Sequence, residues 1–226
     1  MPGTPPLGPA AHPRVLVLTH PACRAILLFV LAVAVAAATA LAASPARAQA
    51  PAACPAAGQA LGAVAAAAVE AAILCLVNGE RAGRGLPPVG RTAALELSAQ
   101  RHAADMVSRR YFAHVSPSGG TLDKRAGRAG YITAPCWALG ENLARAPLDA
   151  TSADAVVEAW MGSPKHRSVI LDGDFRDGGI GVVTRPPTGD GSGATFVLEV
   201  GAMVPCTGAT AGGSIRAAPR APVRPG

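Results

Sequence analysis

The spacing of apolar residues predicts a series of helices in the middle of the chain. Positions such as Leu95, Ala99 and Met106 recur every three or four residues, as on the buried face of an amphipathic helix. Gly85 and Gly130 each close such a stretch, because glycine readily takes the left-handed conformation that ends a helix. We expect helices over residues 63–84, 93–110, 122–129 and 153–161, and a short helix that starts at Ser163 and Pro164.

A different pattern follows in the last third of the chain. The segments 179–184 (GIGVVT) and 194–200 (ATFVLEV) are rich in β-branched and apolar residues, and turn-forming residues (RPPTGDGSG) lie between them. This arrangement predicts a hairpin, and a third strand is expected over 137–142. Helices first and a hairpin last predict an α+β fold, with helices packed on a small, mainly antiparallel sheet.

The first 48 residues have the pattern of a secretory signal peptide. Residues 25–43 are apolar except for Thr39, Arg14 and Arg24 precede them, and Ala46 and Ala48 supply the small residues of a cleavage site. We expect cleavage after Ala48 and a secreted protein. The alternative is that the segment is retained as a membrane anchor, because about 18 apolar residues can span a bilayer.

Composition divides the rest of the chain. Residues 49–62 form an Ala- and Pro-rich leader, residues 63–206 are long enough for one domain with a real core, and residues 207–226 have the composition of a disordered tail. The formal net charge of +6 comes from arginines in 1–48 and 207–226, so the segment 49–206 is neutral. A neutral domain offers no basic surface for nucleic acid, which we therefore exclude as a partner. We expect the protein to be a monomer.

The cysteines predict two disulfides. Cys23 leaves with the signal peptide, and the four cysteines that remain are Cys54, Cys75, Cys136 and Cys206. An even number in an exported chain favours disulfides, and we prefer Cys54–Cys75 with Cys136–Cys206 among the three connectivities. Reduced thiols packed as small apolar groups are the alternative. No C-x-x-C is present, which argues against a zinc knuckle or a thioredoxin-like site.

Only three histidines follow the signal peptide. His102 lies within a predicted helix and is interpreted as a helix-surface or helix-packing residue, whereas His114 follows the helix end and either faces a cavity or caps the helix. His166 is the third residue of a predicted helix, where the helix dipole disfavours protonation, so it is either a neutral ligand or an exposed first-turn residue. Glu141 follows a glycine and is either a cavity group or a turn residue.

Six motifs in order resemble one family. The segments YFAHVSPSGGT, AGY, GENLA, AVVEAWMGSPKHRSVIL, FRDGGIGVV and TFVLEVG, between about Ile73 and Gly201, are similar to the bacterial branch of the CAP superfamily, also called SCP-like extracellular domains. The resemblance implies an α-β-α sandwich, a secreted location and an open cleft that holds two histidines and two acids. Carried over residue by residue, the cleft would contain His114, Glu141 and His166, with Ser163 and Asn142 nearby.

One family acid is missing from this sequence. Ser163 stands three residues after Trp160, where the resemblance would place the second acid. Glu158 on the same predicted helix and Glu199 on the last predicted strand are the residues that could replace it.

These residues suggest binding rather than catalysis. Two imidazoles and a carboxylate (His114, His166 and Glu141) suit a divalent metal, with zinc as first choice. A hydrolase that uses Ser116 or Ser163 with a histidine and Glu141 is an alternative, but the chain has no G-x-S-x-G motif. The resemblance also allows a lipid- or sterol-binding module, or an envelope role with the tail as a tether. The expected partner is therefore a small molecule, a lipid or a cell-surface component.

Overall fold

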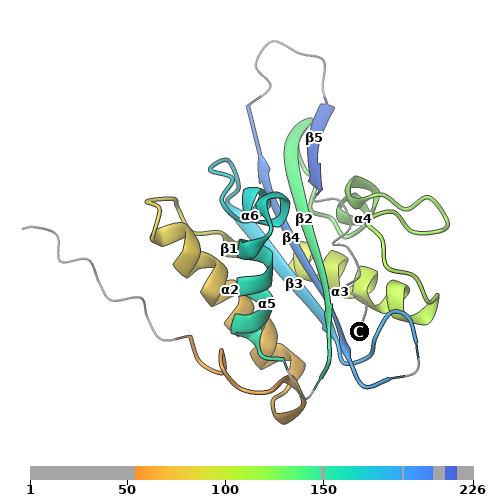
Figure 1. The fold of residues 1–226 in the computed structure, drawn as a ribbon. Coiled ribbons are helices and arrows are strands. Elements are labelled where there is room, and N and C mark those ends of the chain that lie inside the picture. The colour runs from red at the N-terminus through yellow and green to blue at the C-terminus, as the bar shows by residue number, and fades with distance from the viewer. Residues whose placement is uncertain (1–53, 149–150, 190, 206–211, 218–226) are drawn as a thin grey trace, which may run out of the picture. The chain divides into compact units, whose positions relative to one another are not determined.

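The computed structural model describes residues 54–148, 151–189, 191–205 and 212–217, and all of them belong to the unit Pro51–Gly226. A sheet of five strands lies between two groups of helices (Figure 1). Its strands are β1 (Gly90–Arg91), β2 (Cys136–Ala146), β3 (Asp177–Val183), β4 (Ala194–Met203) and β5 (Gly212–Ala217). The helices are η1 (Leu61–Ala63), α2 (Ala66–Ala82), α3 (Ala93–Ser108), α4 (Leu122–Arg128), α5 (Ala153–Gly162) and α6 (Pro164–Ile170).

The expected α-β-α sandwich is confirmed. Helices α2, α5 and α6 cover one face of the sheet, and α3 and α4 cover the other (Figure 1). The strand order is β1-β3-β4-β2-β5. The long strands β3, β4 and β2 pair antiparallel as expected, whereas the short edge strands β1 and β5 pair parallel with β3 and β2.

Glycines in β3 let α3 lie directly on the sheet. A methyl group at Gly179 or Gly181 would overlap the α3 backbone at residues 95–96 and 99–100. These two positions share one face of the strand, since side chains alternate along it. Gly178 points to the other face and lies against Leu74 of α2. The motif DGGIGVV therefore sets the distance between the sheet and its two helical layers.

Buried Arg81 joins two connecting segments on the α2 side, the loop after α2 and the segment between α6 and β3. The side chain is fully buried and donates only to backbone carbonyls: Nε to Pro87 at 2.9 Å, Nη1 to Ile170 at 2.7 Å and Asp172 at 2.8 Å, and Nη2 to Phe175 at 3.1 Å. Buried carbonyls need donors, and the planar guanidinium supplies four at once. Arg81 thus fixes the end of α6 and the start of β3 against α2.

The structure confirms one expected disulfide. Cys54 and Cys75 are joined, with a Cα–Cα distance of 5.7 Å, which ties the chain before η1 to α2. Cys136 is also disulfide-bonded, and its expected partner Cys206 lies outside the described residues, as does the signal peptide 1–48. None of the described helices is long and apolar enough to cross a membrane.

The tail differs from expectation. We expected residues 207–226 to be disordered, but Gly212–Ala217 form β5 and pair with Cys136–Glu141 of β2. The remainder of the tail lies outside the described residues. A strand at a sheet edge is held by backbone hydrogen bonds, so it needs none of the side-chain alternation that a sequence pattern would show.

Candidate functional site

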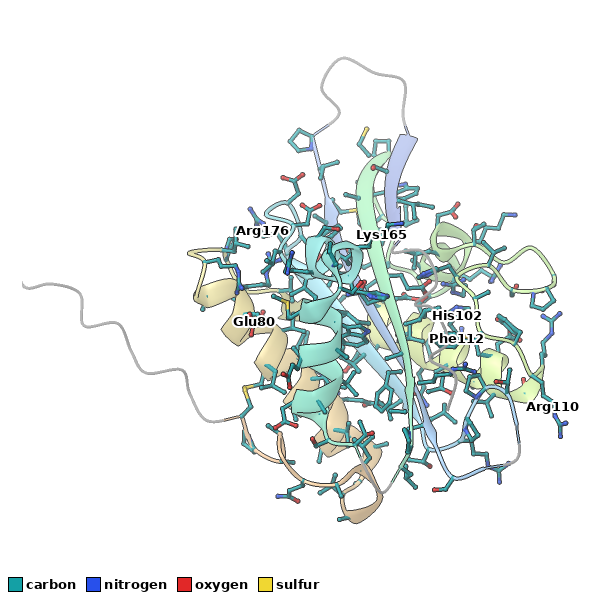
Figure 2. The ribbon with its side chains drawn as sticks, viewed as in Figure 1. Glu80, His102, Arg110, Phe112, Lys165 and Arg176 are labelled. Carbon is teal, nitrogen blue, oxygen red and sulfur yellow. A yellow bond between two sulfur atoms is a disulfide. The ribbon has the colours of Figure 1, made fainter. Side chains whose placement is uncertain are left out.

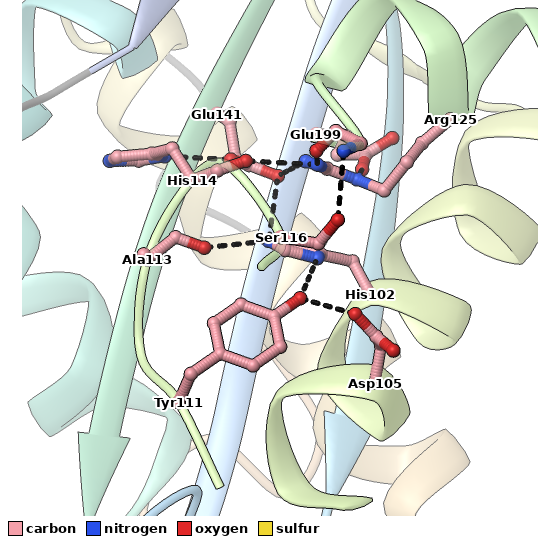
Figure 3. A network of polar contacts seen from close by, with 10 residues as sticks. His102, Asp105, Tyr111, Ala113, His114, Ser116, Arg125, Glu141 and Glu199 are labelled. Carbon is pink, nitrogen blue, oxygen red and sulfur yellow. Dashed lines mark hydrogen bonds and ion pairs between the residues drawn. The ribbon is translucent and has the colours of Figure 1, made fainter. Parts of the chain in front are cut away.

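Two buried glutamates on neighbouring strands form the centre of the candidate site. Glu141 of β2 lies opposite Glu199 of β4 in the antiparallel ladder, and both side chains are wholly buried. Both face α3 and α4, where Glu141 meets His102 and Arg125 (Figure 3). Two carboxyl groups so placed cannot both ionise without a large cost, so their surroundings must separate their pKa values.

Glu141 uses both of its carboxylate oxygens. Nδ1 of His114 donates to Oε1 at 2.6 Å, and Nη2 of Arg125 donates to Oε2. Nε2 of His102 lies 3.8 Å from Oε2. Burial alone would raise the pKa of Glu141, but the hydrogen bond from His114 and the charge of Arg125 outweigh burial and hold the pKa below its usual value. The carboxylate is therefore ionised at neutral pH.

Glu199 takes the opposite protonation state. Burial raises the pKa of Glu199 to about 8, the negative charge of Glu141 adds to the shift, and the charge of Arg125 opposes it. Nε of Arg125 lies 3.8 Å from Oε1 of Glu199, which is too long for an ordinary hydrogen bond. At neutral pH the site thus holds one carboxylate, one guanidinium and one mostly protonated carboxyl group.

Arg125 also holds the loop that carries His114. Leu122, Arg125 and Ala126 form the buried face of α4. Nη1 of Arg125 donates to the carbonyl of His114 at 2.9 Å and to that of Gly120 at 3.0 Å. One side chain therefore balances the buried carboxylate and fixes the backbone next to it.

A second group of contacts fixes the start of this loop. Nε2 of His102 donates to the carbonyl of Ala113 at 3.1 Å, and the Tyr111 hydroxyl donates to Asp105 (Figure 3). Burial lowers the pKa of His102 to about 4, although the charge of Glu141 opposes the shift, so the ring is neutral. His102 lies on the α3 side of the sheet, inside the molecule (Figure 2). It is the packing histidine that the sequence suggested.

His166 stands close to this network without a hydrogen bond to it. It is the third residue of α6 and only 4% exposed, and Nδ2 of Asn142 donates to its carbonyl at 3.0 Å. Burial lowers the pKa of His166, and the charge of His114 adds to the shift. The ring is neutral, with burial rather than the helix dipole as the leading cause. The effect of His114 places the two imidazoles within electrostatic reach of each other.

The remaining residues proposed from the sequence differ in whether they contact this network. Ser163 is the N-cap residue of α6, but its hydroxyl makes no capping hydrogen bond. Glu158 is exposed on α5 and has no hydrogen bond or ion pair to the network in the described residues. Glu199, the other acid considered, lies beside Arg125 and Glu141. His114 and Glu141 come into contact and His166 lies near them, whereas neither Ser163 nor Glu158 is hydrogen-bonded to them in the described residues.

The expected three-residue metal site is not formed as a direct ligand set. Among residues 54–148, 151–189, 191–205 and 212–217, no group of three or more His, Cys, Asp or Glu side chains is arranged to hold a metal ion. Both oxygens of Glu141 already accept from His114 and Arg125. The imidazoles of His114 and His166 are the donors that remain.

Arg125 is the main residue that sequence reasoning missed. It lies in LDKRAGR, where neighbouring basic residues are exposed and nothing in composition singles it out. The available signal was position: Arg125 is three residues after Leu122, on the same face of the helix. Glu199 had a clearer signal, because an acid within the apolar run TFVLEV is unusual in a strand that is buried on both faces.

Comparison with known proteins gives a family match and two curated relatives. Residues 74–200 match the sequence model of CAP, the cysteine-rich secretory protein family. The chain is 36% identical over 117 residues to the uncharacterized protein YkwD of Bacillus subtilis, which covers 50% of this chain and 42% of YkwD. It is 34% identical over 115 residues to the uncharacterized membrane protein YlbC of the same organism, which covers 50% of this chain and 31% of YlbC. The chain thus spans less than half the length of either relative.

Similar solved structures are more distant. An extracellular protein with an SCP domain from Bacillus anthracis is 27% identical, with a TM-score of 0.46, and the match covers 58% of this chain and 39% of that protein. An outer surface protein of Borrelia burgdorferi is 21% identical, with a TM-score of 0.48, and the match covers 58% of this chain and 90% of that protein.

Proposed function

Because the chain belongs to the cysteine-rich secretory protein (CAP) family, with more than half of its length matched, we propose that its domain is a secreted binding module without catalytic activity. The ligand would meet the imidazoles of His114 and His166. Small molecules with a metal-binding group and divalent transition metals are the ligand classes that this donor set suits.

The observation that carries the proposal is the orientation of His114. Its Nδ1 donates to buried, ionised Glu141, so in the neutral ring Nε2 carries the free lone pair. Nε2 has no protein partner in the described residues, and the His114 side chain is 17% exposed. A carboxylate that fixes one ring nitrogen while the other binds a ligand is the usual arrangement of metal-bound histidines. Neutral His166 supplies the second imidazole.

The residues fit a divalent metal only in part. Two imidazole nitrogens would be direct ligands, and Glu141 would orient His114 rather than bind the ion itself. Zinc sites normally use three or four protein ligands, so water or a donor from a small ligand would complete the coordination. We therefore expect zinc to bind more weakly than in a structural zinc site.

Calorimetric titration of zinc into the protein from residue 49 onward tests this assignment. His114→Ala and His166→Ala should each abolish or strongly weaken binding. Glu141→Gln should weaken binding less, because an amide oxygen can still accept from Nδ1 of His114. Glu158→Gln removes the same charge from an exposed position and is the control. Zinc binding that survives both histidine substitutions would contradict the proposed site.

The contacts of the two candidate serines do not favour the hydrolase alternative. The Ser116 hydroxyl accepts from the backbone N–H of Gly120 at 2.8 Å and lies 3.1 Å from the Ser118 hydroxyl. Ser163 is an N-cap residue, and neither serine is hydrogen-bonded to a histidine in the described residues. A fluorophosphonate probe should therefore label neither serine, and labelling that His114→Ala abolishes would revive a catalytic role.

The disulfides support the proposed secretion. The Cys54–Cys75 bond and the bonded state of Cys136 suit an oxidising compartment, since cytosolic thiols stay reduced. The signal peptide 1–48, cleaved after Ala48, would provide the export route. Mass spectrometry of protein collected outside the cell should find a new N-terminus at Gln49, and an uncut N-terminus would favour a retained membrane anchor.

A further inference from the structure

A pocket of about 250 Å³ lies beside the glutamate network, between α3, the loop that follows His114 and α4. Ser98, Arg101, His102 and Asp105 line it, and their spacing puts them on one face of the helix. Ser98 and His102 are buried and form the floor, whereas Arg101 is exposed at the rim. None of the residues proposed to bind metal lines this pocket, although His102 and Arg125 border both the pocket and the network around Glu141.

The opposite wall comes from the His114 loop and α4. It consists of Ser116, Ser118, Arg125 and Arg128. The guanidinium of Arg128 lies over the turn at Gly120, because a methyl group on that glycine would be 3.8 Å from Nη2 of Arg128 and 2.7 Å from the Ser116 hydroxyl. Arg128 is exposed and Arg125 is buried, so this wall also carries positive charge from rim to floor.

The positive charge at the rim is not compensated by the protein. In the described part of the chain, neither Arg101 nor Arg128 has an ion pair or a side-chain hydrogen bond. Asp105, the acid of the pocket lining, already accepts from the Tyr111 hydroxyl and pairs with Arg109 at 3.7 Å. The two rim guanidinium groups therefore leave an excess of positive charge over the pocket.

Hydroxyl donors accompany this charge. The hydroxyl oxygens of Ser116 and Ser118 are 3.1 Å apart. The buried Ser98 hydroxyl lies near the carboxyl group of Glu199, but no hydrogen bond of ordinary geometry joins Ser98 to Glu199. Nε of Arg125 is also buried without a hydrogen bond. Both of these atoms lie beside Glu199 at the base of the pocket, so the hydroxyl groups that a ligand can meet are those of Ser116 and Ser118.

We propose that this pocket binds the phosphate group of a small phosphomonoester. The two unpaired guanidinium groups at the rim match the two charges of a phosphate dianion, and arginine binds its oxygens in a planar, two-pronged geometry. Serine hydroxyls supply the shorter-range donors. The volume of about 250 Å³ admits a phosphate with a small organic body.

Titration of inorganic phosphate into the protein from residue 49 onward, at constant ionic strength, is the direct test. We expect saturable binding with a Kd of about 1 mM or tighter. Arg101→Gln and Arg128→Gln should each weaken it about tenfold, because each removes a charge-assisted hydrogen bond. Both arginines are exposed, so the variants should fold normally. Arg84→Gln, which removes the same charge from an exposed pair with Glu80, should leave binding unchanged.

Two results would overturn the proposal. One is an absence of binding up to about 10 mM phosphate, far above the expected Kd. The other is binding that the Arg101→Gln, Arg128→Gln double variant retains in full. Succinate serves as a second probe, because it carries two carboxylates in place of the phosphate. Tighter binding of phosphate than of succinate supports the assignment, whereas the reverse order would assign the pocket to dicarboxylates. Zinc titration of the same variants should be unaffected, which separates this pocket from the histidine site.

Discussion

Replacement of Glu199 by glutamine should remove part of the pH dependence of stability. The substitution keeps the shape of the side chain and removes its ability to ionise. Burial and the adjacent charge of Glu141 raise the pKa of Glu199 from 4.5 to about 8 in the folded protein. In the unfolded chain the ordinary value applies, so between these two pH values the folded state holds a proton that the unfolded state has lost.

The sign and size of the effect follow from proton linkage. Since the folded state binds more protons, the free energy of unfolding falls as the pH rises, by up to about 1.4 kcal/mol per pH unit. The loss begins above the unfolded pKa of 4.5 and levels off only above the folded pKa of about 8, so its total is at most about 5 kcal/mol. Glu199→Gln lacks this loss and should become progressively more stable than the wild type over the same interval.

Urea denaturation at pH 5, 6, 7, 8 and 9, with the disulfides intact, measures the difference directly. The unfolding free energy of Glu199→Gln minus that of the wild type should increase steadily from pH 5 to pH 8 and flatten toward pH 9. The same substitution at exposed Glu158 is the control and should give a difference that does not change with pH. A constant difference for Glu199→Gln would show that Glu199 is ionised throughout and would refute the assignment of protonation states in the site.

Three other variants test the framework around the site by thermal or urea unfolding. Arg81→Lys should destabilise the fold by roughly 2–5 kcal/mol, because an ammonium group cannot reach all four carbonyls; a loss below about 1 kcal/mol would contradict its role. Gly181→Ala should cost about 1–3 kcal/mol, since the methyl group meets the α3 backbone, and an unchanged midpoint would show that α3 can move away. Cys54→Ser with Cys75→Ser opens a loop with a sequence separation of 21 and should cost about 3 kcal/mol; an unchanged midpoint would contradict a stabilising role for this disulfide.

Local patterns predicted the layers of the fold but not its sheet edges. The helices were predicted because each has an apolar face and a residue that stops it, and the hairpin because β-branched runs flank a turn. Strand β1 has only two residues, Gly90 and Arg91, too few for any pattern. Strand β5 depends on the exposed edge of β2, which does not exist until the sheet has formed.

The site was predictable only in part for a related reason. His114 and Glu141 lie in motifs that resemble a family, and the resemblance predicted that the two residues share one cleft. The partnership of Arg125 with Glu141 joins residues 16 apart on a helix and a strand, and Glu199 reaches the pair only through the register of β4 on β2. Both carboxyl groups are buried, and which of them is ionised depends on the hydrogen bond from His114 and on the position of the Arg125 guanidinium; neither is a property of the local sequence.

In the proposed site, Glu141 fixes His114 so that Nε2 faces the ligand together with His166. Two-bond proton–nitrogen NMR of the histidine rings during a zinc titration follows each ring nitrogen separately. We expect a proton on Nδ1 of His114 before zinc is added, then large nitrogen shifts at Nε2 of His114 and on the ring of His166, with His102 unchanged. A proton on Nε2 of His114, or shifts confined to other histidines, would contradict it.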